Sequence, residues 1–368
     1  MSSVPALRIA LALSGGGVRA MVFHLGVLRL LAERRLLENV RRISSVSGGS
    51  LLVGLMLQET ALRWPSSEEF LSSVAPLLRT KLSSRSMQWG AVRQLLLPWN
   101  WRFILSRANL LAIALRREWG VSAKLGSLPD GPEWSINGTT AENGKRFRFK
   151  RDKIGDYDLG YADAENLPLS SAMAVSAAFP GGFGPLTLDA SRFEWRKRPW
   201  GAPVGTEQVV DIAFRQLHLY DGGVYDNLGL EPFFDAGRGV PKNAGEIIVV
   251  SDAGAPLKPA FSLFALNPWR LKRVADIMSE QARALRVRAF SNYLQQQPRR
   301  GAYLYINTPV TGSAPCSSQA FASSFPTTLR RLTLQEFDTL FEHGYRVARQ
   351  VEARYGLVGT PGPAGMTA

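Results

Sequence analysis

Cysteine and histidine are scarce in this sequence. Its 368 residues include one cysteine, Cys316, and three histidines. A single cysteine excludes an intrachain disulfide and a cysteine-rich zinc site, which fits a reducing compartment. EF-hand spacing is also missing, so nothing suggests a calcium site. We therefore expect neither a metal nor another cofactor.

Long hydrophobic runs are missing as well. No stretch reaches the ~18 apolar residues of a membrane-spanning helix, and the longest candidate, Phe103 to Leu115, is interrupted by Arg107 and Asn109. The apolar run near the N-terminus lacks a preceding basic region and leads into glycines, so we interpret it as a strand and not a signal peptide. These features predict a cytoplasmic protein or one that binds a membrane surface peripherally.

Acidic residues are outnumbered. The 30 acidic and 44 basic residues give a formal net charge of +14, which favours nucleic acid, anionic lipid surfaces or acidic proteins as partners. Zinc-finger spacing and basic runs interleaved with aromatic residues are both missing, so we expect no nucleic acid. Composition does not separate an anionic lipid surface from an acidic protein, and peripheral contact with an anionic membrane surface is the partner interaction that we expect.

The first 60 residues alternate between strand and helix patterns. Leu7 to Leu13 is apolar apart from Arg8 and is typical of a buried parallel strand. Glycines follow, and apolar residues at spacings of three and four then predict a helix. Arg41 to Val46 resembles a second strand and Gly49 to Gln58 the next helix. This order is the opening of an α/β sheet.

The rest of the chain shows neither a linker nor an internal repeat. We predict one domain over residues 1–358, with a mostly helical insertion at about 61–128 and a disordered tail at 359–368. A long amphipathic helix is predicted over Leu334 to Tyr355. The later strand candidates are Trp134 to Thr139, Arg146 to Lys150, Gln216 to Tyr220, Glu246 to Ser251 and Ala302 to Ile306.

The stretch ISSVSGGSLL, residues 43–52, places serines and glycines between a strand and a helix. A nucleophile elbow needs small residues two positions before and after its serine, because the turn is tight. Ser47 has Ser45 and Gly49 at these positions, whereas Ser50 has a bulky leucine after it. Ser47 is therefore the best candidate nucleophile. The same residues also fit a serine N-cap at a helix start.

The stretch SGGGVRA, residues 14–20, is a glycine loop between a strand and a helix. Backbone N–H groups of Gly15, Gly16 and Gly17 can point into a cavity there, and the helix start adds a partial positive charge. The loop is a poor dinucleotide fingerprint, since no acidic residue ends the second strand, and it lacks the lysine of a P-loop. An oxyanion hole fits it better, and an ordinary tight turn is the alternative.

The stretch LYDGGVYDNLGL, residues 219–230, contains a carboxylate at a strand end, Asp221, followed by Gly222 and Gly223. Such a carboxylate can reach the carboxyl edge of a neighbouring strand, where Ser47 is expected. Asp226 and Asn227 fit an ordinary turn.

None of the three histidines is well placed for a catalytic triad. His24 lies inside the first helix, His343 inside the last, and His218 is an odd number of residues from Asp221 on the same strand, so it points to the other face. We interpret all three as packed or surface residues. The sequence favours a dyad in which Asp221 accepts the proton of Ser47, which a raised carboxylate pKa would promote.

Together these motifs resemble the patatin-like phospholipase family, over residues 7 to 310 or so. SGGGVR looks like its oxyanion loop, SVSGGS like its elbow and DGG like its catalytic aspartate motif, in the family's order along the chain. The resemblance implies a three-layer α/β/α fold with a mostly parallel central sheet and a helical insertion. Ser45 departs from the pattern, because the family usually has glycine there.

The resemblance also implies an activity and a set of site residues. Ser47 would attack an acyl ester of a lipid and Asp221 would accept its proton, through an acyl-enzyme. The implied oxyanion hole comprises the glycine loop and the residue after the nucleophile. Supporting roles fall to an arginine and to glycines of the motifs. These hole and supporting residues are Gly15, Gly16, Gly17 and Gly48, and Arg19, Gly49, Gly222 and Gly223.

The segment Leu95 to Trp119 combines tryptophans, arginines and leucines. This composition suits a lid or a helix that docks on an anionic membrane, and equally a buried helical hairpin with solvated arginines. Two other functions stay open. An acyltransferase would use the same scaffold with another acceptor than water, and a non-catalytic protein would bind anions or membranes through its basic surface.

Overall fold

A computed structural model describes residues 7–104, 106–180, 182–259, 269–310 and 317–356. The predicted tail at 359–368 lies outside these residues. The helices are α1 (Gly17–Glu33), α2 (Gly48–Glu59), α3 (Ser67–Glu69), α4 (Ala75–Ser84), α5 (Met87–Leu95), α6 (Ala108–Glu118), α7 (Leu169–Ser176), α8 (Gly223–Asp226), α9 (Trp269–Gln296), α10 (Ser317–Ser324) and α11 (Leu334–Tyr355).

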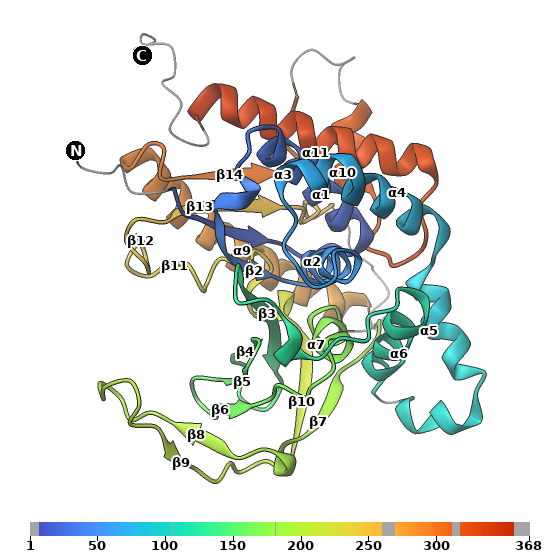
Figure 1. Ribbon diagram of the computed structural model, residues 1–368, viewed down its shortest axis with the longest axis vertical. Helices are drawn as coiled ribbons and strands as arrows, with labels where there is room; N and C mark the ends of the chain where they lie inside the picture. The colour runs from blue at the N-terminus through green and yellow to red at the C-terminus, as the bar shows by residue number, and fades with distance from the viewer. Residues whose placement is uncertain (1–6, 105, 181, 260–268, 311–316, 357–368) are drawn as a thin grey trace.

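Strands of the described chain form one large mixed sheet and a small two-stranded one (Figure 1). The strands are β1 (Ile9–Leu13), β2 (Val40–Ser45), β3 (Glu133–Thr140), β4 (Arg146–Phe149), β5 (Lys153–Asp156), β6 (Gly160–Asp163), β7 (Leu186–Asp189), β8 (Trp195–Lys197), β9 (Gln208–Val209), β10 (Gln216–Asp221), β11 (Phe234–Asp235), β12 (Val240–Pro241), β13 (Ile247–Asp252) and β14 (Gly301–Tyr305).

The centre of the large sheet is parallel, in the order β14-β13-β1-β2-β3. Beyond β3 the sheet continues antiparallel through β4, β5, β6, β8 and β9. The predicted α/β fold with a parallel centre is confirmed, and the antiparallel extension is an addition that the sequence patterns did not indicate.

Strand β3 is shared by two neighbours on one edge. Its first half pairs with β2, where Ser45 lies opposite Ile136, and its second half pairs with β10, where Asp221 lies opposite Gly138. Strand β4 pairs with the other edge of β3. Strand β10 therefore pairs with the same edge as β2, further along β3. The end of β10 therefore meets the end of β2, two positions apart along β3.

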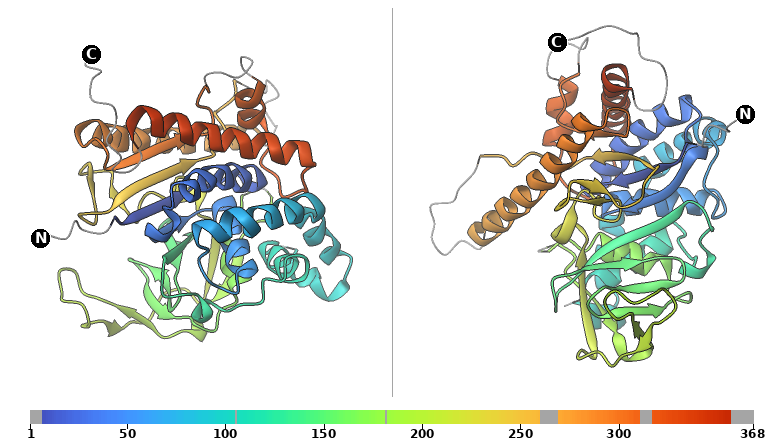
Figure 2. Two further views of the ribbon diagram at one scale, coloured as in Figure 1. Left: turned by 45° about the horizontal axis from the view of Figure 1, so that its top comes forward. Right: turned by 90° about the vertical axis from the view of Figure 1, so that its left-hand side faces the viewer.

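Helices cover both faces of the parallel centre (Figure 2). In β1, alternate residues belong to different cores: Ile9, Leu11 and Leu13 pack with the cluster under α1 and α2, and Ala10 and Ala12 pack with the cluster under α9. Because strand side chains alternate in direction, this split defines three layers. Helix α11 packs on α1 in the first layer, and the start of α9 projects from the body (Figure 2).

Most of the predicted elements are confirmed. The predicted helix Leu334 to Tyr355 matches α11, and the two early strands, the five later strand candidates and the helix after Gly49 match within a few residues. Helices α3 to α6 occupy residues 67–118, where a helical insertion was predicted. The assignment of 1–358 to a single domain stays a prediction.

Candidate active site

The elbow serine has a backbone conformation that side chains rarely adopt. Ser47 lies between β2 and α2 with φ 49° and ψ −117°. A positive φ costs a non-glycine residue about 1–2 kcal/mol, and such strain gathers at functional sites. The Ser47 hydroxyl makes no capping bond to α2. The geometry is therefore that of a strained strand-to-helix turn and not that of a serine N-cap.

Glycines make this turn possible, as the spacing predicted. A methyl group on Gly49 would lie 2.5 Å from the carbonyl oxygen of Leu13, and one on Gly48 would lie 2.2 Å from that of Gly17. The elbow therefore presses against β1 and against the glycine loop. Any side chain at either position would push the nucleophile away from them.

Ser45, where the resembling family usually has glycine, fits without reaching the nucleophile. Its hydroxyl is buried, accepts a hydrogen bond from Trp134 Nε1 at 2.8 Å and lies 2.8 Å from Ser50 Oγ. The extra hydroxymethyl group lies between β3 and α2, where its hydroxyl has these two partners. The substitution therefore leaves the turn around Ser47 intact.

Asp221 lies next to Ser47 at the end of β10. The strand sharing on β3 brings it there, and its backbone is fixed by Thr139 Oγ1, which donates to the Asp221 carbonyl at 2.9 Å. Burial raises the pKa of its carboxyl from 3.8 to about 7, although hydrogen bonds from the Gly223 N–H and the Ser47 side chain pull it down. A carboxylate with this proton affinity is suited to accept a serine proton.

The glycine loop presents free N–H groups beside the elbow. Gly16 and Gly17 have φ of 145° and 62°, values that favour glycine. Within the described chain, no acceptor bonds the N–H of Gly16, Gly17 or Gly48. The N–H of Val18, by contrast, is satisfied by the Thr328 carbonyl at 2.9 Å. Three backbone N–H groups next to the elbow thus have no acceptor within the described residues.

Gly15 and Asn227 form the wall next to this loop. The Gly15 N–H donates to the Asn227 carbonyl at 3.1 Å, so it is not free for an oxyanion. A methyl group on Gly15 would lie 2.4 Å from Asn227 Oδ1 and 3.1 Å from Ser47 Cβ. The Asn227 side chain thus borders the site, although the sequence suggested only a turn there; its place follows from chain packing that no local pattern reveals.

The three histidines stand outside this arrangement, as predicted. His24 is fully buried, with Nε2 3.0 Å from the Ser14 carbonyl and Nδ1 2.7 Å from Ser251 Oγ. Since a carbonyl only accepts, Nε2 carries the proton, and burial lowers the His24 pKa to about 4. His343 is buried against the Ile306 carbonyl, and half-buried His218 bonds Glu142 on the face opposite Asp221.

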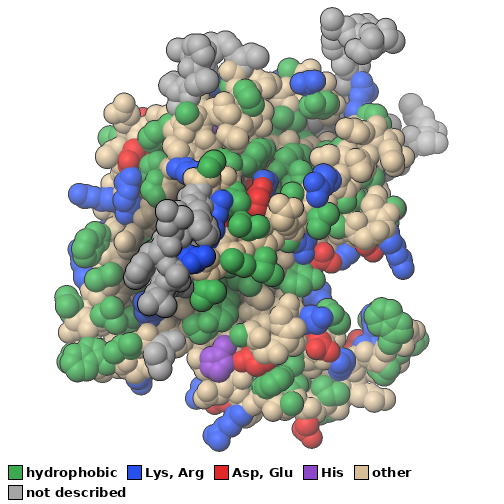
Figure 3. Space-filling view, turned by 180° about the vertical axis from the view of Figure 1, so that it is seen from behind, with side chains coloured by type: hydrophobic (Ala, Val, Ile, Leu, Met, Phe, Trp, Pro, Cys, Tyr) green, Lys and Arg blue, Asp and Glu red, His purple; other side chains and the backbone are tan. Residues whose placement is uncertain are grey.

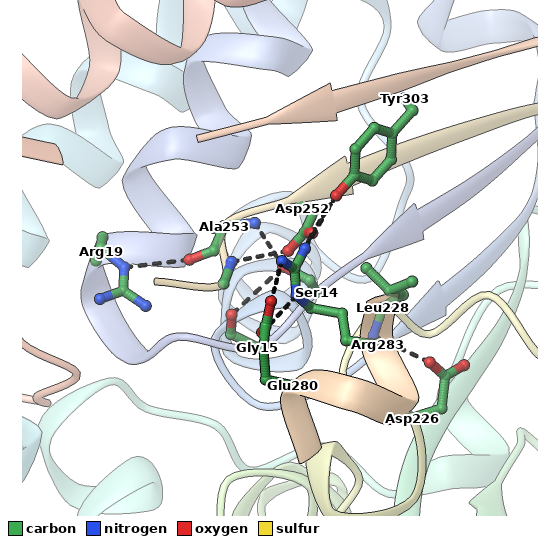
Figure 4. Close-up of polar contacts among 11 residues, drawn as sticks. Ser14, Gly15, Arg19, Asp226, Leu228, Asp252, Ala253, Glu280, Arg283 and Tyr303 are labelled. Atoms are coloured by element: carbon green, nitrogen blue, oxygen red, sulfur yellow. Dashed lines mark hydrogen bonds and ion pairs between the residues drawn. The ribbon is translucent and has the colours of Figure 1, made fainter. Parts of the chain in front are cut away.

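A network behind the loop holds its backbone (Figure 4). Arg19 Nε donates to the Ala253 carbonyl at 3.2 Å, and the Ala253 N–H donates to Ser14 Oγ at 2.7 Å. Asp252, fully buried, accepts from Arg283 and from the Tyr303 hydroxyl, each at 2.6 Å. Burial lowers the pKa of Arg19 to about 10, so it stays charged at neutral pH. Arg19 therefore supports the loop from behind.

Metal-binding residues do not gather in the part of the chain that the structure describes. No group of three or more histidine, cysteine, aspartate or glutamate side chains is placed to hold an ion there. Within the same residues, no helix is both long and apolar enough to cross a membrane.

The sequence matches the family model of the patatin-like phospholipases over residues 11–234, more than half of the chain. The chain belongs to the patatin-like phospholipase family. The matched span of this patatin-like protein includes the whole glycine loop, the elbow and the aspartate motif. No curated protein gives a significant match to it.

Solved structures of a human phospholipase show the same fold at low identity. Human GIVD cytosolic phospholipase A2 aligns with 94% of this chain and 59% of its own, with a TM-score of 0.53 at 16% identity. The same enzyme in complex with methyl gamma-linolenyl fluorophosphonate and terbium chloride has a TM-score of 0.51 at 15% sequence identity. That alignment covers 94% of this chain and 58% of the human chain. VipD from Legionella pneumophila has a TM-score of 0.42 at 15% sequence identity, and the alignment covers 95% of this chain and 67% of VipD. The chain spans less than two thirds of the human enzyme, and the likeness shows the α/β fold alone.

Proposed function

We propose that this patatin-like protein is a serine lipid acyl hydrolase of the phospholipase A or lysophospholipase type. It cleaves fatty acyl esters of membrane lipids with a Ser47–Asp221 dyad. The observation that carries the proposal is the pairing of a serine at a strained elbow with a buried carboxylate whose pKa is about 7. None of the three described histidines hydrogen-bonds Ser47 or Asp221, which supports a dyad instead of a triad.

The reaction proceeds in two steps. Ser47 Oγ attacks the ester carbonyl carbon while Asp221 accepts the hydroxyl proton, and the proton then passes to the departing alcohol as the ester bond breaks. Water attacks the resulting acyl-enzyme, Asp221 accepts a proton from it, and the fatty acid leaves with Ser47 reprotonated. Protons balance over the cycle, and no cofactor is required.

The negative charge of each tetrahedral intermediate falls to the backbone N–H groups of Gly16, Gly17 and Gly48. The support for this role is that these donors are unbonded within the described chain and are packed against the elbow. Preorganised donors of this kind contribute about 3–4 kcal/mol each to acyl transfer. Gly15 is left out, since its N–H is already bonded.

A lipid panel assayed with wild type and Ser47→Ala tests the hydrolase. We expect release of fatty acid by the wild type and a loss of at least about a thousandfold in the variant. Added alcohol acceptors distinguish the acyltransferase, which would form new esters in place of free acid. Unchanged hydrolysis by Ser47→Ala would refute the proposal, and no turnover with any lipid would favour a binding protein.

Substrate access, we further propose, uses an anionic membrane surface next to α5. In the segment Leu95 to Trp119, helix α6 buries its apolar face, as in the hairpin alternative. The turn between α5 and α6 instead exposes its apolar side chains to solvent: Leu96, Trp99 and Trp101 are 77%, 64% and 58% exposed. In the reversed view of Figure 3, hydrophobic side chains reach the surface near Lys and Arg in this region. Exposed tryptophans beside arginines suit the interface of an anionic bilayer.

Vesicle binding tests this surface. The double variant Leu96→Ser, Trp99→Ser should sediment less with vesicles of phosphatidylcholine and phosphatidylglycerol, yet hydrolyse a soluble monomeric ester like wild type. The matched control is Leu271→Ser, Met278→Ser, which removes two exposed apolar side chains from α9. If the control loses binding while the first variant keeps it, the docking surface is α9 and not this turn.

A further inference from the structure

Behind the elbow, buried side chains from four elements form one continuous run of hydrogen bonds. Trp134 Nε1 donates to Ser45 Oγ at 2.8 Å, Ser45 bonds Ser50 at 2.8 Å, and Ser50 bonds Ser176 at 2.8 Å. The run ends where Ser176 Oγ donates to the Asn137 carbonyl at 2.7 Å. The three hydroxyls are fully buried and Trp134 nearly so. The run joins β3, β2, α2 and α7.

The last acceptor fixes the direction of every proton in this run. A carbonyl oxygen only accepts, so the single hydroxyl proton of Ser176 goes to Asn137. Ser176 must then accept from Ser50, Ser50 must accept from Ser45, and Ser45 must accept from the indole N–H of Trp134, which only donates. Each hydroxyl thus has one possible orientation.

Ser176 also holds the proposed nucleophile. The Ser47 N–H donates to Ser176 Oγ at 3.0 Å. Ser47 comes after the last residue of β2 and before the first residue of α2, so its N–H takes no part in the strand ladder or in the helix bonds. Without Ser176 this N–H would be a buried donor with no partner in the described chain, which is costly. The strained turn would then relax.

The same hydroxyl connects Ser47 to the aspartate motif. The Asn137 carbonyl, which accepts from Ser176, lies against Gly222: a methyl group there would be 2.4 Å from that oxygen. Ser176 therefore bridges the backbone of the elbow and the strand segment on which the turn after Asp221 packs.

We propose that Ser176 is a positioning residue that sets the distance and angle between Ser47 and Asp221, with its lone pairs oriented by the run from Trp134 through Ser45 and Ser50. The inference rests on the proposed hydrolase function. It also gives Ser45 a role: its hydroxyl relays the orientation that glycine at this position could not supply.

The test compares Ser176→Ala with Ser106→Ala on a soluble ester. Ser106 is a matched control, because its buried hydroxyl likewise donates to a carbonyl, that of Pro185, and accepts from a backbone N–H, that of Thr187. Both variants should lose unfolding stability. Only Ser176→Ala should lose about 10- to 100-fold in kcat with KM within about twofold, since small misplacements of reacting groups cost that much.

A pH profile separates positioning from a merely structural role. When Ser47 no longer holds its hydrogen bond to Asp221, the bond that lowers the Asp221 pKa is lost, so the acidic limb of kcat/KM moves to higher pH in Ser176→Ala. Equal kcat losses in both variants, or an unmoved limb, would overturn the proposal. If Ser176→Ala does not fold, Ser176→Cys, a weaker acceptor, should show the same shift to a smaller degree. Full activity of Ser47→Ala would instead refute the hydrolase itself.

Discussion

At the residue scale, Ser47 and Asp221 both hold states that weaken the fold. Ser47 has a positive φ, and Asp221 places a carboxyl where burial raises its pKa to about 7. Such costs persist where a site needs them. A serine with a negative φ would form an ordinary helix start. An aspartate exposed to solvent, with a pKa near 3.8, would be too weak a base to accept the serine proton. The two unfavourable states therefore support the same proposed reaction.

The Asp221 pKa predicts opposite pH dependences of activity and stability. Since the ionised form accepts the serine proton, kcat/KM should rise with pH and level off above about 7. Since the folded pKa lies above the value of 3.8 for an exposed group, this residue's contribution to stability is full below about pH 4 and is lost as pH rises through 7. A pH–rate profile and denaturation curves at several pH values measure both.

Asp221→Asn should separate these effects. The variant should be inactive at every pH, and at pH 8 more stable than wild type by up to about 4 kcal/mol, at ~1.4 kcal/mol per unit of pKa. Its advantage should vanish at pH 4. A variant that is less stable than wild type at pH 8 would contradict the assigned burial cost.

Gly17 offers a test of the glycine loop. Gly17→Ala should lose both stability and kcat, because φ is 62° and the added methyl would lie 2.4 Å from the Thr328 carbonyl oxygen. A kcat loss of about 100- to 1,000-fold is expected if one oxyanion donor is displaced. Gly120→Ala is the control, since Gly120 has φ 72° and no atom within 4 Å of the added methyl. Equal losses of kcat in both variants would count against the loop's role.

At the element scale, His24 ties α1 to the ends of β1 and β13. Its neutral ring donates to Ser14 and accepts from Ser251. His24→Leu leaves both groups unpaired and should cost about 2–5 kcal/mol of unfolding free energy. In wild type the folded pKa of about 4 lies below 6.5, so this residue's contribution falls as pH drops from 6.5 to 4. Denaturation curves of the variant should therefore show a smaller loss of stability between pH 6.5 and 4 than those of wild type. An unchanged loss would argue against this role of His24.

Elements with strong local patterns were predictable, and those made by packing were not. Strand β1 is a continuous apolar run, and α11 begins at a capping box from Thr333 to Glu336. Strands β5 and β6, in contrast, contain Gly155 and Gly160 at positive φ, and β9 has only two residues. Helix α9 was not predicted either, because its apolar and charged residues do not form a clear core face and Leu271 and Met278 are exposed.

The residues of the candidate site divide in the same way. Ser47, Asp221 and the glycine loop stand out because tight turns restrict residue types. Asn227, Trp134 and Ser176 do not, since their places depend on contacts between segments far apart in the chain. The bonded N–H of Gly15 belongs to the same class: nothing in SGGG indicates which glycine faces a carbonyl.

At the scale of the whole molecule, one sheet brings the elbow, the glycine loop and the aspartate together. Its parallel centre carries the elbow and the glycine loop, and β3 passes the edge to β10, which brings the aspartate. The chain carries a formal net charge of +14. Under the proposed function, this charge would draw the protein to anionic lipid surfaces before any specific contact forms.

Ionic strength tests this attraction. Affinity for vesicles that contain phosphatidylglycerol should fall by at least tenfold between about 50 mM and 500 mM salt, because screening shortens the range of charge interactions. Hydrolysis of a soluble neutral ester should change little over the same range. Vesicle sedimentation measures the first and fatty acid release the second. Salt-independent sedimentation would mean that apolar contact alone holds the protein.

The most direct test of the dyad is the site of covalent modification by a fluorophosphonate, read by mass spectrometry of peptides from wild type and Asp221→Asn. We expect one adduct, on Ser47, which forms rapidly in wild type and is lost or slowed at least a hundredfold in Asp221→Asn. An adduct on another serine, or equal labelling of Ser47 in both proteins, would contradict it.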